Sequence, residues 1–362
     1  MYRFLQFRRN SLGPLAGWVF VVCLSGSAFA QKYAQIDLVS DIPGTAVVTD
    51  RTLVNAWGIA NGPTSPFWVN ANGTGRSNLY AKDGTPISQL RSVRIPPPHG
   101  STETSAPTGI VFNGTSDFAI SGNGVTVPSV FIFATEDGTI SGWNPQVALR
   151  HAVLAVDNSG IGAIYKGLAI ATTPNGSFIY AANFFNGSIE MYDTNFQLVK
   201  TFTDITLPPG YAPFNIQRIG GFLYVTFAKQ DADKEDDVPG AGHGFVDIFT
   251  FQGHMVKRFA SGGVLNSPWG LAMAPPSFGR FGGCLLVGNF GDGEINAYCQ
   301  NGQGQFHPAG TLREDRKPLV IDGLWGIGFG NNAGSGSADV LYFAAGPDDE
   351  MNGSFGKVEF TP

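Results

Sequence analysis

A short apolar phrase recurs six times along this chain, and its regular spacing limits the possible folds more than any other feature. The phrase is clearest as Ser267-Pro-Trp-Gly-Leu-Ala272. Its central glycine, replaced once by asparagine, stands at Gly58, Gly109, Gly167, Asn215, Gly270 and Gly326. The separations of 51, 58, 48, 55 and 56 residues indicate one structural unit that is repeated along the chain. Six such units with strand-like patterns predict a six-bladed β-propeller.

Each repeat contains four short apolar runs that are separated by turn residues. In the fifth repeat these runs cover 271–274, 283–288, 294–299 and the region near Thr311. Eight Asn-Gly pairs occur along the chain, and this pair favours the positive φ angles of tight hairpin turns. The pattern therefore predicts an all-β domain built from four-stranded blades.

The last repeat ends after only three strands, and a fourth strand is available at the other end of the domain. Residues 33–40 precede the first copy of the phrase, as the outer strands precede the later copies. Pairing this segment with the last blade would close the ring and remove free sheet edges that invite aggregation. We therefore expect the N-terminal strand to complete the sixth blade.

The first thirty residues have the features of a secretory signal peptide. Three arginines lie within the first nine residues, residues 18–24 are apolar, and Ala28-Phe-Ala30 matches a signal peptidase site. The apolar run is too short to span a bilayer as a retained anchor. We expect cleavage after Ala30, a single propeller domain at 31–362, and a periplasmic or extracellular location. The general secretory route and the twin-arginine route both remain open.

The acidic charge balance restricts the possible partners. The full chain has a formal net charge of −6 at pH 7. Residues 1–30 contain three arginines and no acidic residue, so their removal leaves a net charge of −9. An acidic surface disfavours nucleic acid and anionic membranes and suits cationic ligands or metal ions. We expect a monomer that neither binds nucleic acid nor inserts into a membrane.

Two cysteines, Cys284 and Cys299, remain after the predicted cleavage. They stand at equal distances on either side of the Gly291-Asp292 turn, so an antiparallel hairpin would place them opposite each other. In an oxidising compartment we expect a cross-strand disulfide. Two buried thiols are the alternative, because cross-strand geometry often strains such a bond.

The blade order places the candidate ligand-binding residues on one face of the ring. The loop that enters a blade's innermost strand and the loop between its second and third strands open on the same face, here called the mouth face. The candidate residues of this face are Trp57, Lys166, Asn183, Trp269, Asn289 and Trp325. The tryptophans are interpreted either as repeated packing residues or as an aromatic floor for a sugar or a cationic group.

Two acidic loops of the mouth face are candidates for calcium binding. One carries Asp231, Asp233 and Glu235, and the other carries Asp348 and Asp349. Clustered carboxylates supply the six to eight oxygen ligands that Ca²⁺ accepts. The first loop is not an EF-hand, because an aspartate stands where that motif requires glycine. The alternative interpretation is a solvated run of charge on surface loops.

The common catalytic motifs are absent from the sequence. The chain has no Gly-x-Ser-x-Gly elbow, no His-Glu-x-x-His motif and no P-loop. His243 stands at the end of the first acidic loop between two glycines, where it is a candidate general base. A surface or turn histidine is the alternative interpretation of this residue.

Several longer phrases give the chain a family resemblance. Residues 266–272, 288–298, 321–326 and 228–234 resemble segments of an uncharacterised family of exported bacterial proteins, which is similar in pattern to the NHL-type six-bladed propellers. This resemblance implies the fold and export, and it brings no established reaction. The architecture is also similar to that of gluconolactonase-like and strictosidine-synthase-like enzymes, and this similarity implies a divalent ion at the channel mouth.

Two functions from different classes fit these features. The first is an exported module that binds a small molecule or a protein through the mouth face and is stabilised by Ca²⁺. The alternative is a metal-dependent hydrolase of lactones or esters, in which the ion polarises a carbonyl and activates water. A structural role in the cell envelope is a third possibility. The sequence does not decide whether the protein is an enzyme.

Overall fold

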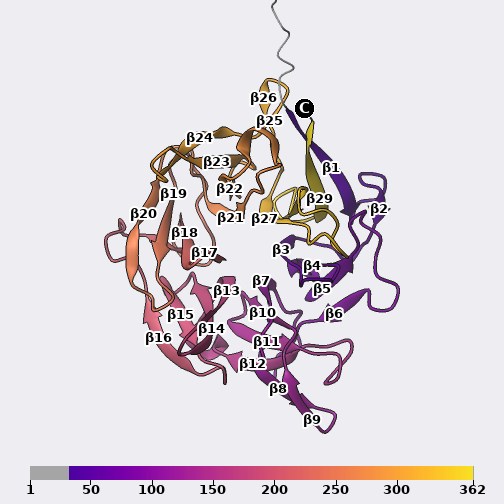
Figure 1. Ribbon diagram of the computed structural model, residues 1–362. Helices are drawn as coiled ribbons and strands as arrows, with labels where there is room; N and C mark the ends of the chain where they lie inside the picture. The colour runs from indigo at the N-terminus through magenta and orange to yellow at the C-terminus, as the bar shows by residue number, and fades with distance from the viewer. Residues whose placement is uncertain (1–31, 362) are drawn as a thin grey trace, which may run out of the picture. The chain divides into compact units, whose positions relative to one another are not determined.

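The structure, a computed structural model, describes residues 32–361, which form six four-stranded antiparallel sheets around a central axis (Figure 1). The predicted six-bladed β-propeller is therefore confirmed. In each blade the first strand lies innermost, and the later strands follow outwards in order. The predicted signal peptide, residues 1–30, lies outside the described residues.

The first three blades follow the chain, with one inserted hairpin. Blade 1 contains β3 (Ala56–Ala60), β4 (Phe67–Ala71), β5 (Arg76–Tyr80) and β6 (Ser92–Arg94). Blade 2 contains β7 (Pro107–Phe112), β10 (Phe131–Thr135), β11 (Thr139–Trp143) and β12 (Val153–Asp157). Its inserted hairpin contains β8 (Ala119–Gly122) and β9 (Val125–Pro128). Blade 3 contains β13 (Tyr165–Thr173), β14 (Gly176–Asn183), β15 (Ser188–Tyr192) and β16 (Leu198–Phe202).

The last three blades include the strand that closes the ring. Blade 4 contains β17 (Tyr211–Ile219), β18 (Phe222–Lys229), β19 (Gly244–Phe249) and β20 (Met255–Ser261). Blade 5 contains β21 (Pro268–Met273), β22 (Leu285–Asn289), β23 (Ile295–Gln300) and β24 (Phe306–Thr311). A small hairpin follows, with β25 (Arg313–Glu314) and β26 (Lys317–Pro318). Blade 6 contains β27 (Leu324–Phe329), β28 (Leu341–Ala345), β29 (Ser354–Thr361) and β1 (Lys32–Ser40), and β2 (Val48–Thr49) extends its sheet.

The described residues contain little helix. Three single turns of 3-10 helix occur at η1 (Asn72–Thr74), η2 (Ser159–Ile161) and η3 (Gly279–Phe281). No helix within 32–361 has the length and hydropathy that a membrane crossing would require.

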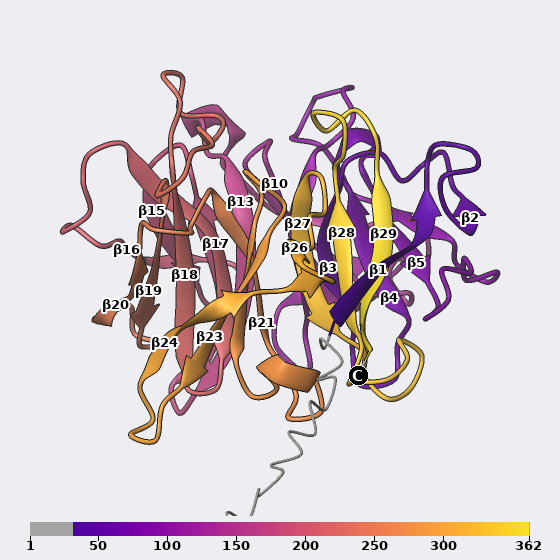
Figure 2. The same cartoon turned by 90° about the horizontal axis from the view of Figure 1, so that it is seen from above.

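The ring closes as the sequence predicted. β1 pairs antiparallel with β29, and the paired positions run from Lys32 opposite Thr361 to Ser40 opposite Ser354. Figure 2 shows β1 beside β29 in the sixth blade. This pairing gives the last three-stranded sheet its fourth strand and joins the two ends of the domain.

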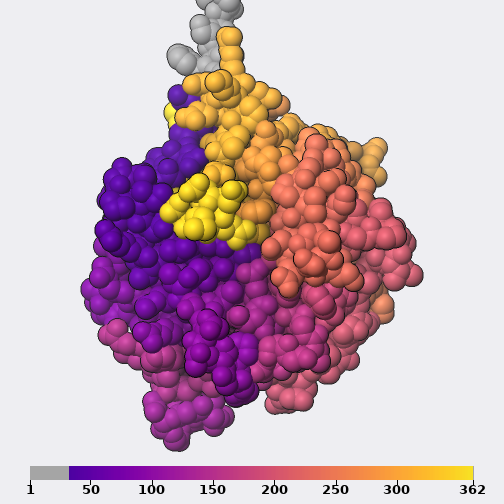
Figure 3. Space-filling model, turned by 180° about the vertical axis from the view of Figure 1, so that it is seen from behind, coloured from indigo at the N-terminus to yellow at the C-terminus, as the bar shows by residue number. Residues whose placement is uncertain are grey.

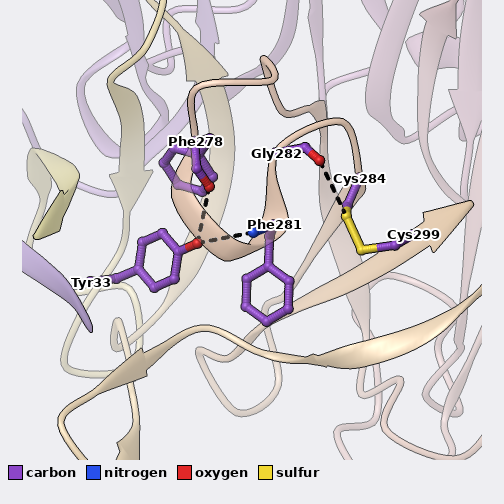
Figure 4. Close-up of a disulfide and its surroundings, with 6 residues drawn as sticks. All are labelled: Tyr33, Phe278, Phe281, Gly282, Cys284 and Cys299. Atoms are coloured by element: carbon purple, nitrogen blue, oxygen red, sulfur yellow. Dashed lines mark hydrogen bonds between the residues drawn. A yellow bond between two sulfur atoms is a disulfide. The ribbon is translucent and has the colours of Figure 1, made fainter. Parts of the chain in front are cut away.

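Tyr33 of β1 also anchors the closing strand to blade 5. Its hydroxyl donates to the carbonyl of Phe278 at 3.1 Å and accepts from the amide of Phe281 at 3.3 Å (Figure 4). The predicted disulfide between Cys284 and Cys299 is confirmed, and its two Cα atoms are 4.3 Å apart. The disulfide lies just beyond the loop that Tyr33 contacts, so this part of blade 5 is held both covalently and by hydrogen bonds.

The recurring glycine is explained by the close approach of neighbouring inner strands. A Cβ atom added to Gly58 would lie 2.1 Å from the carbonyl oxygen of Thr108 in the next blade. The same atom on Gly326 would lie 2.6 Å from the carbonyl oxygen of Trp57. Blade 4 replaces the glycine with Asn215, whose side-chain amide donates to the carbonyl of Trp269 at 2.8 Å. The phrase therefore recurs because each inner strand approaches the next blade closely at this position.

Six clusters of the hydrophobic core lie between neighbouring blades, one between each pair. Between blades 1 and 2, for example, Trp68 stacks on Phe131 with ring centroids 4.3 Å apart. Complete burial of one large apolar side chain contributes roughly 1.5–3 kcal/mol, so the blades hold one another in place. The mouth-face loops project from this rigid frame.

Candidate ligand-binding site at the channel mouth

Six aromatic side chains from five blades meet where the inner strands begin, and we call this group the aromatic plug. Its members are Trp57, Phe184, Phe214, Trp269, Phe290 and Trp325. Trp57 and Trp325 are stacked with centroids 3.6 Å apart, and Trp325 also stacks on Phe290 at 3.9 Å. Phe214 contacts Trp325 at 5.6 Å although their blades are not adjacent. Because the plug spans the axis, it separates the channel from the mouth face.

The local backbone that presents the tryptophans is specialised. Two positions before each of the three tryptophans, the backbone is left-handed, with φ of 48° at Asn55, 46° at Ser267 and 62° at Gly323. The Asn55 carboxamide oxygen accepts a hydrogen bond from Trp325 Nε1 at 3.1 Å. Asparagine tolerates this conformation better than most residues, because its short polar side chain bonds locally. The turn at Asn55 therefore orients the indole of Trp57 in its own repeat. It also places the Asn55 side-chain oxygen where it accepts the hydrogen bond from Trp325 of the neighbouring repeat.

Lys166, near the start of β13, places a buried cation on the plug. Its side chain is 2% exposed, and its Nζ lies 5.3 Å from the ring centroid of Trp57. The ammonium donates to Glu136 and, at 2.9 Å, to Asp236 Oδ1. Burial alone lowers the pKa of Lys166, but the two carboxylates reverse this effect and hold the pKa above its ordinary value. The lysine is therefore a permanent positive charge at the mouth face.

A pocket of about 560 Å³ opens beside this ammonium. We call it the acidic pocket, and its lining residues are Glu136, Asp137, Ile164, Glu235, Asp236, Asp349 and Glu350. They come from the β10–β11 loop, the β12–β13 loop, the β18–β19 loop and the β28–β29 loop. Figure 3 shows the mouth face, where the yellow β28–β29 loop and the coral β18–β19 loop both reach the centre. The two acidic loops identified in the sequence thus meet at one site.

Hydrogen bonds hold the pocket carboxylates in place. Asn55 Nδ2 donates to Glu350 Oε2 at 2.5 Å, and Asn72 Nδ2 donates to Glu136 Oε2 at 2.7 Å. The amide of Ala106 donates to Asp137 at 2.8 Å. These donors come from blade 1 and from the segment that enters blade 2, so the pocket is supported by the ring itself.

The β28–β29 loop reaches the pocket through an unusual turn. Asp348, Asp349 and Glu350 have φ of 59°, 50° and 65°, three consecutive left-handed residues without a glycine. Each such residue costs of the order of 1 kcal/mol in backbone energy. The amide of Asp348 donates to Asp322 Oδ2 at 3.0 Å, which helps to hold this turn.

The carboxyl of Glu350 ionises with difficulty. Burial raises its pKa to about 7, and the neighbouring carboxylates of Glu136 and Asp236 act in the same direction. The ammonium of Lys166 and the hydrogen bond from Asn55 oppose this shift. Because like charges crowd the pocket, an added cation near Glu350 would favour its charged form.

The structure brings together some of the predicted site residues and separates others. Glu235 and Asp349 line the acidic pocket, whereas Asp231, Asp233 and Asp348 do not. The Asp231 carboxylate accepts from the amide of Glu235 at 3.0 Å and thereby shapes its own loop.

The three remaining predicted residues have local partners. His243 Nδ1 lies 2.8 Å from the carbonyl oxygen of Val238 in its own loop. Asn183 is buried, and its amide donates to Glu190 at 2.7 Å. Asn289 is also buried, and its amide donates to the carbonyl of Val264 at 2.7 Å. The structure places none of the three in the lining of the acidic pocket.

Sequence reasoning missed Glu136 and the supporting donor Asn55. Glu136 lies in the β10–β11 loop, between the second and third strands of its blade, as the two acidic segments do in their blades. This shared loop position is the sequence feature that could have identified Glu136. Its turn carries only two acidic residues and did not stand out by composition.

The predicted calcium site is not tested by this arrangement. Within 32–361 no group of three or more His, Cys, Asp or Glu side chains has the geometry of a metal site. Carboxylate oxygens that suit a hard cation are nevertheless available from Glu235 and Asp349 in the acidic pocket. Calcium binding therefore stays a prediction.

Comparison with known proteins gives relatives of undetermined function. No protein-family model matches the chain. Two uncharacterized proteins of Acanthamoeba polyphaga mimivirus, R648 and L690, are each 33% identical to it. The first match covers 89% of this chain and 78% of R648, and the second covers 89% of this chain and 84% of L690. These relatives are viral, so the bacterial origin and the export implied by the sequence resemblance stay predictions.

Two solved lyase structures share the fold. A streptogramin B lyase has a TM-score of 0.51 and 11% identity, with 91% of this chain and 98% of that chain covered. A catalytically inactive virginiamycin B lyase from Staphylococcus aureus, determined with quinupristin, has a TM-score of 0.51 and 12% identity, with 91% and 99% covered. At this level of identity the similarity shows the propeller fold alone.

Proposed function

The chain belongs to the family of the mimivirus proteins R648 and L690, and we propose that it is a binding module whose acidic pocket takes up a cationic organic group. The observation that carries this proposal is the lining of the pocket, where six of the seven residues are acidic. An ammonium or guanidinium group would find several carboxylate acceptors there at once.

Charge complementarity supports this choice of ligand. Within 32–361 none of Glu235, Asp349 and Glu350 forms an ion pair, whereas Glu136 and Asp236 share the ammonium of Lys166. A cleft lined by one sign of charge concentrates ligands of the opposite sign. The net charge of −9 for residues 31–362 would add to this attraction.

The contacts of Lys166 show how a cation can be held at this site. Its ammonium lies between two carboxylates and over an aromatic ring. Such cation–π contacts contribute roughly 0.5–2 kcal/mol, depending on desolvation. A second cation in the acidic pocket would use the carboxylates that the lysine leaves unpaired.

We also propose that the protein works outside the cytoplasm. The basic, apolar start of the chain supports this proposal, as does the disulfide between Cys284 and Cys299.

The binding proposal is tested with a pair of nearly isosteric probes. N-acetyl-arginine amide carries a guanidinium, and N-acetyl-citrulline amide replaces it with a neutral urea group. Isothermal titration at pH 8 should give saturable binding of the arginine probe that weakens as salt is added, and none of the citrulline probe. Equal binding of the two probes, or binding of neither, would contradict a cation site.

A further inference from the structure

The mouth face exposes large apolar side chains around the acidic pocket. Four loops contribute one such residue each, namely Ile161, Val264, Val320 and Met351, with exposed fractions of 66%, 51%, 54% and 71%. Three of these loops lead into innermost strands, and the fourth joins β28 to β29. By the topology of the blades, all four open on the face that carries the acidic pocket. We call these residues the apolar rim.

The apolar rim is linked to the pocket through the backbone of its loops. Met351 directly follows Glu350, and Ile161 lies three residues before Ile164, which lines the pocket. The loop of Val264 holds the acidic β18–β19 loop, because the Asn266 side-chain oxygen accepts from the amide of Gly240 at 2.6 Å. The rim and the pocket are therefore parts of one surface.

The apolar rim indicates what kind of molecule carries the cation. A free amine or a metal ion would fill the pocket without reaching side chains on four different loops. Exposed apolar residues gathered around a polar centre are typical of protein interaction sites. A partner with a basic side chain at its centre and apolar residues beside it would complement both the charge and the rim.

We propose that the acidic pocket receives an arginine or lysine side chain from a loop of a partner protein, and that apolar residues flanking this side chain pack on the apolar rim. This inference rests on the proposed cation site and adds the class of ligand. The basic side chain binds the carboxylates of the acidic pocket, while the flanking residues cover Ile161 and Met351. The pocket selects the charge, and the rim selects a polypeptide over a free amine.

Three nonapeptides separate these contributions. The first has the sequence acetyl-Gly-Leu-Leu-Gly-Arg-Gly-Leu-Leu-Gly-amide, the second replaces each leucine with serine, and the third replaces the arginine with citrulline. On the wild-type protein, the leucine peptide should bind about tenfold or more tightly than the serine peptide. The citrulline peptide should bind at least tenfold more weakly than the leucine peptide.

A double variant, Ile161→Ser with Met351→Ser, tests the role of the apolar rim. Both side chains are highly exposed, so the fold should tolerate the changes, and the melting temperature checks this. The variant should lose the preference for the leucine peptide and keep its affinity for N-acetyl-arginine amide. Equal affinity of the wild-type protein for the leucine and serine peptides, or an unchanged preference in the variant, would overturn this inference alone. Equal affinity of the wild-type protein for the leucine and citrulline peptides would instead overturn the proposed cation site on which this inference rests.

Discussion

The Nζ atom of Lys166 lies 2.9 Å from Oδ1 of Asp236, which ties the inner strand of blade 3 to the long loop of blade 4. The lysine side chain is 2% exposed, whereas the aspartate side chain is 73% exposed. Glu136 from blade 2 bonds to the same ammonium and is 25% exposed. A buried cation therefore depends on acceptors that water can still reach. This difference in exposure between the lysine and its two acceptors determines how much stability a substitution of each partner should remove.

Removing the acceptor should cost more than removing the lysine. Glu136→Gln leaves a buried ammonium with one charged partner, and we expect the free energy of unfolding to fall by about 2–3 kcal/mol. Lys166→Met leaves carboxylates that can turn to water, so a loss of about 1 kcal/mol is expected. Urea unfolding at pH 7 measures both. Lys357→Met breaks the surface pair with Glu359 and should change stability by less than about 0.5 kcal/mol. Equal losses for the first two variants would refute this account of the pair.

The titration of Glu350 should make stability depend on pH. Its ordinary pKa is 4.5, and in the folded protein burial raises it to about 7, so the folded state binds the proton more tightly than the unfolded chain. The favourable contribution is fully present below pH 4.5 and is lost as the pH rises through about 7. The groups that face this carboxyl, Glu136, Asp236, Lys166 and Asn55, stay in place in a Glu350→Gln variant.

The difference in unfolding free energy between wild type and Glu350→Gln isolates this effect. Measured from pH 4 to pH 8, it should change in favour of the variant as the pH rises. A difference that stays constant over this range would show that Glu350 keeps an ordinary pKa in the folded protein.

The recurring glycine should tolerate no side chain. In Gly58→Ala, the new Cβ would lie 2.1 Å from a backbone oxygen of the next blade, so an inner strand must shift. We expect a loss of about 3 kcal/mol or more in unfolding free energy, because this clash involves backbone at the centre of the ring. Gly221→Ala is the matched control, since no atom lies within 4 Å of its added Cβ. Similar stability of the two variants would remove the explanation given for the repeat.

These contacts also explain why the fold was predictable from sequence. Five inner strands carry this glycine where they approach the next blade, and Asn215 takes its place in blade 4, so the same signal occurs in the sequence six times. Likewise, Cys284 and Cys299 are related through one hairpin, and the disulfide between them follows from local pairing. Each of these features depends on neighbouring repeats or on a single turn.

The site was less predictable because its residues meet only when the ring is closed. Glu136 and Lys166 are 30 residues apart and belong to different blades, and nothing in the plain turn around Glu136 signals the contact. The acidic loops were recognisable by composition, but which carboxylates point inwards depends on the left-handed turn at Asp348 to Glu350. Asn183 and Asn289 were expected in mouth-face loops, but they end β14 and β22, where their buried amides donate to Glu190 and to the carbonyl of Val264.

Calcium binding is tested separately from organic cations. If the acidic pocket holds Ca²⁺, saturation at about one hundred times the dissociation constant should add about 2.7 kcal/mol to stability and raise the melting temperature. The double variant Glu235→Gln with Asp349→Asn should abolish the shift, whereas Asp233→Asn, outside the pocket lining, should retain it. An identical melting temperature in chelator and in millimolar calcium would reject the metal. It would also remove the basis of a metal-dependent hydrolase of lactones or esters.

The most direct measurement compares the affinity for N-acetyl-arginine amide of two carboxylate variants at pH 8. Glu350→Gln removes a charge from the acidic pocket, whereas Glu359→Gln removes one near the end of β29, outside the pocket lining. We expect a loss of about tenfold or more in affinity for the first variant and wild-type affinity for the second. Equal affinities for wild type and both variants would show that the cation, if bound at all, binds elsewhere.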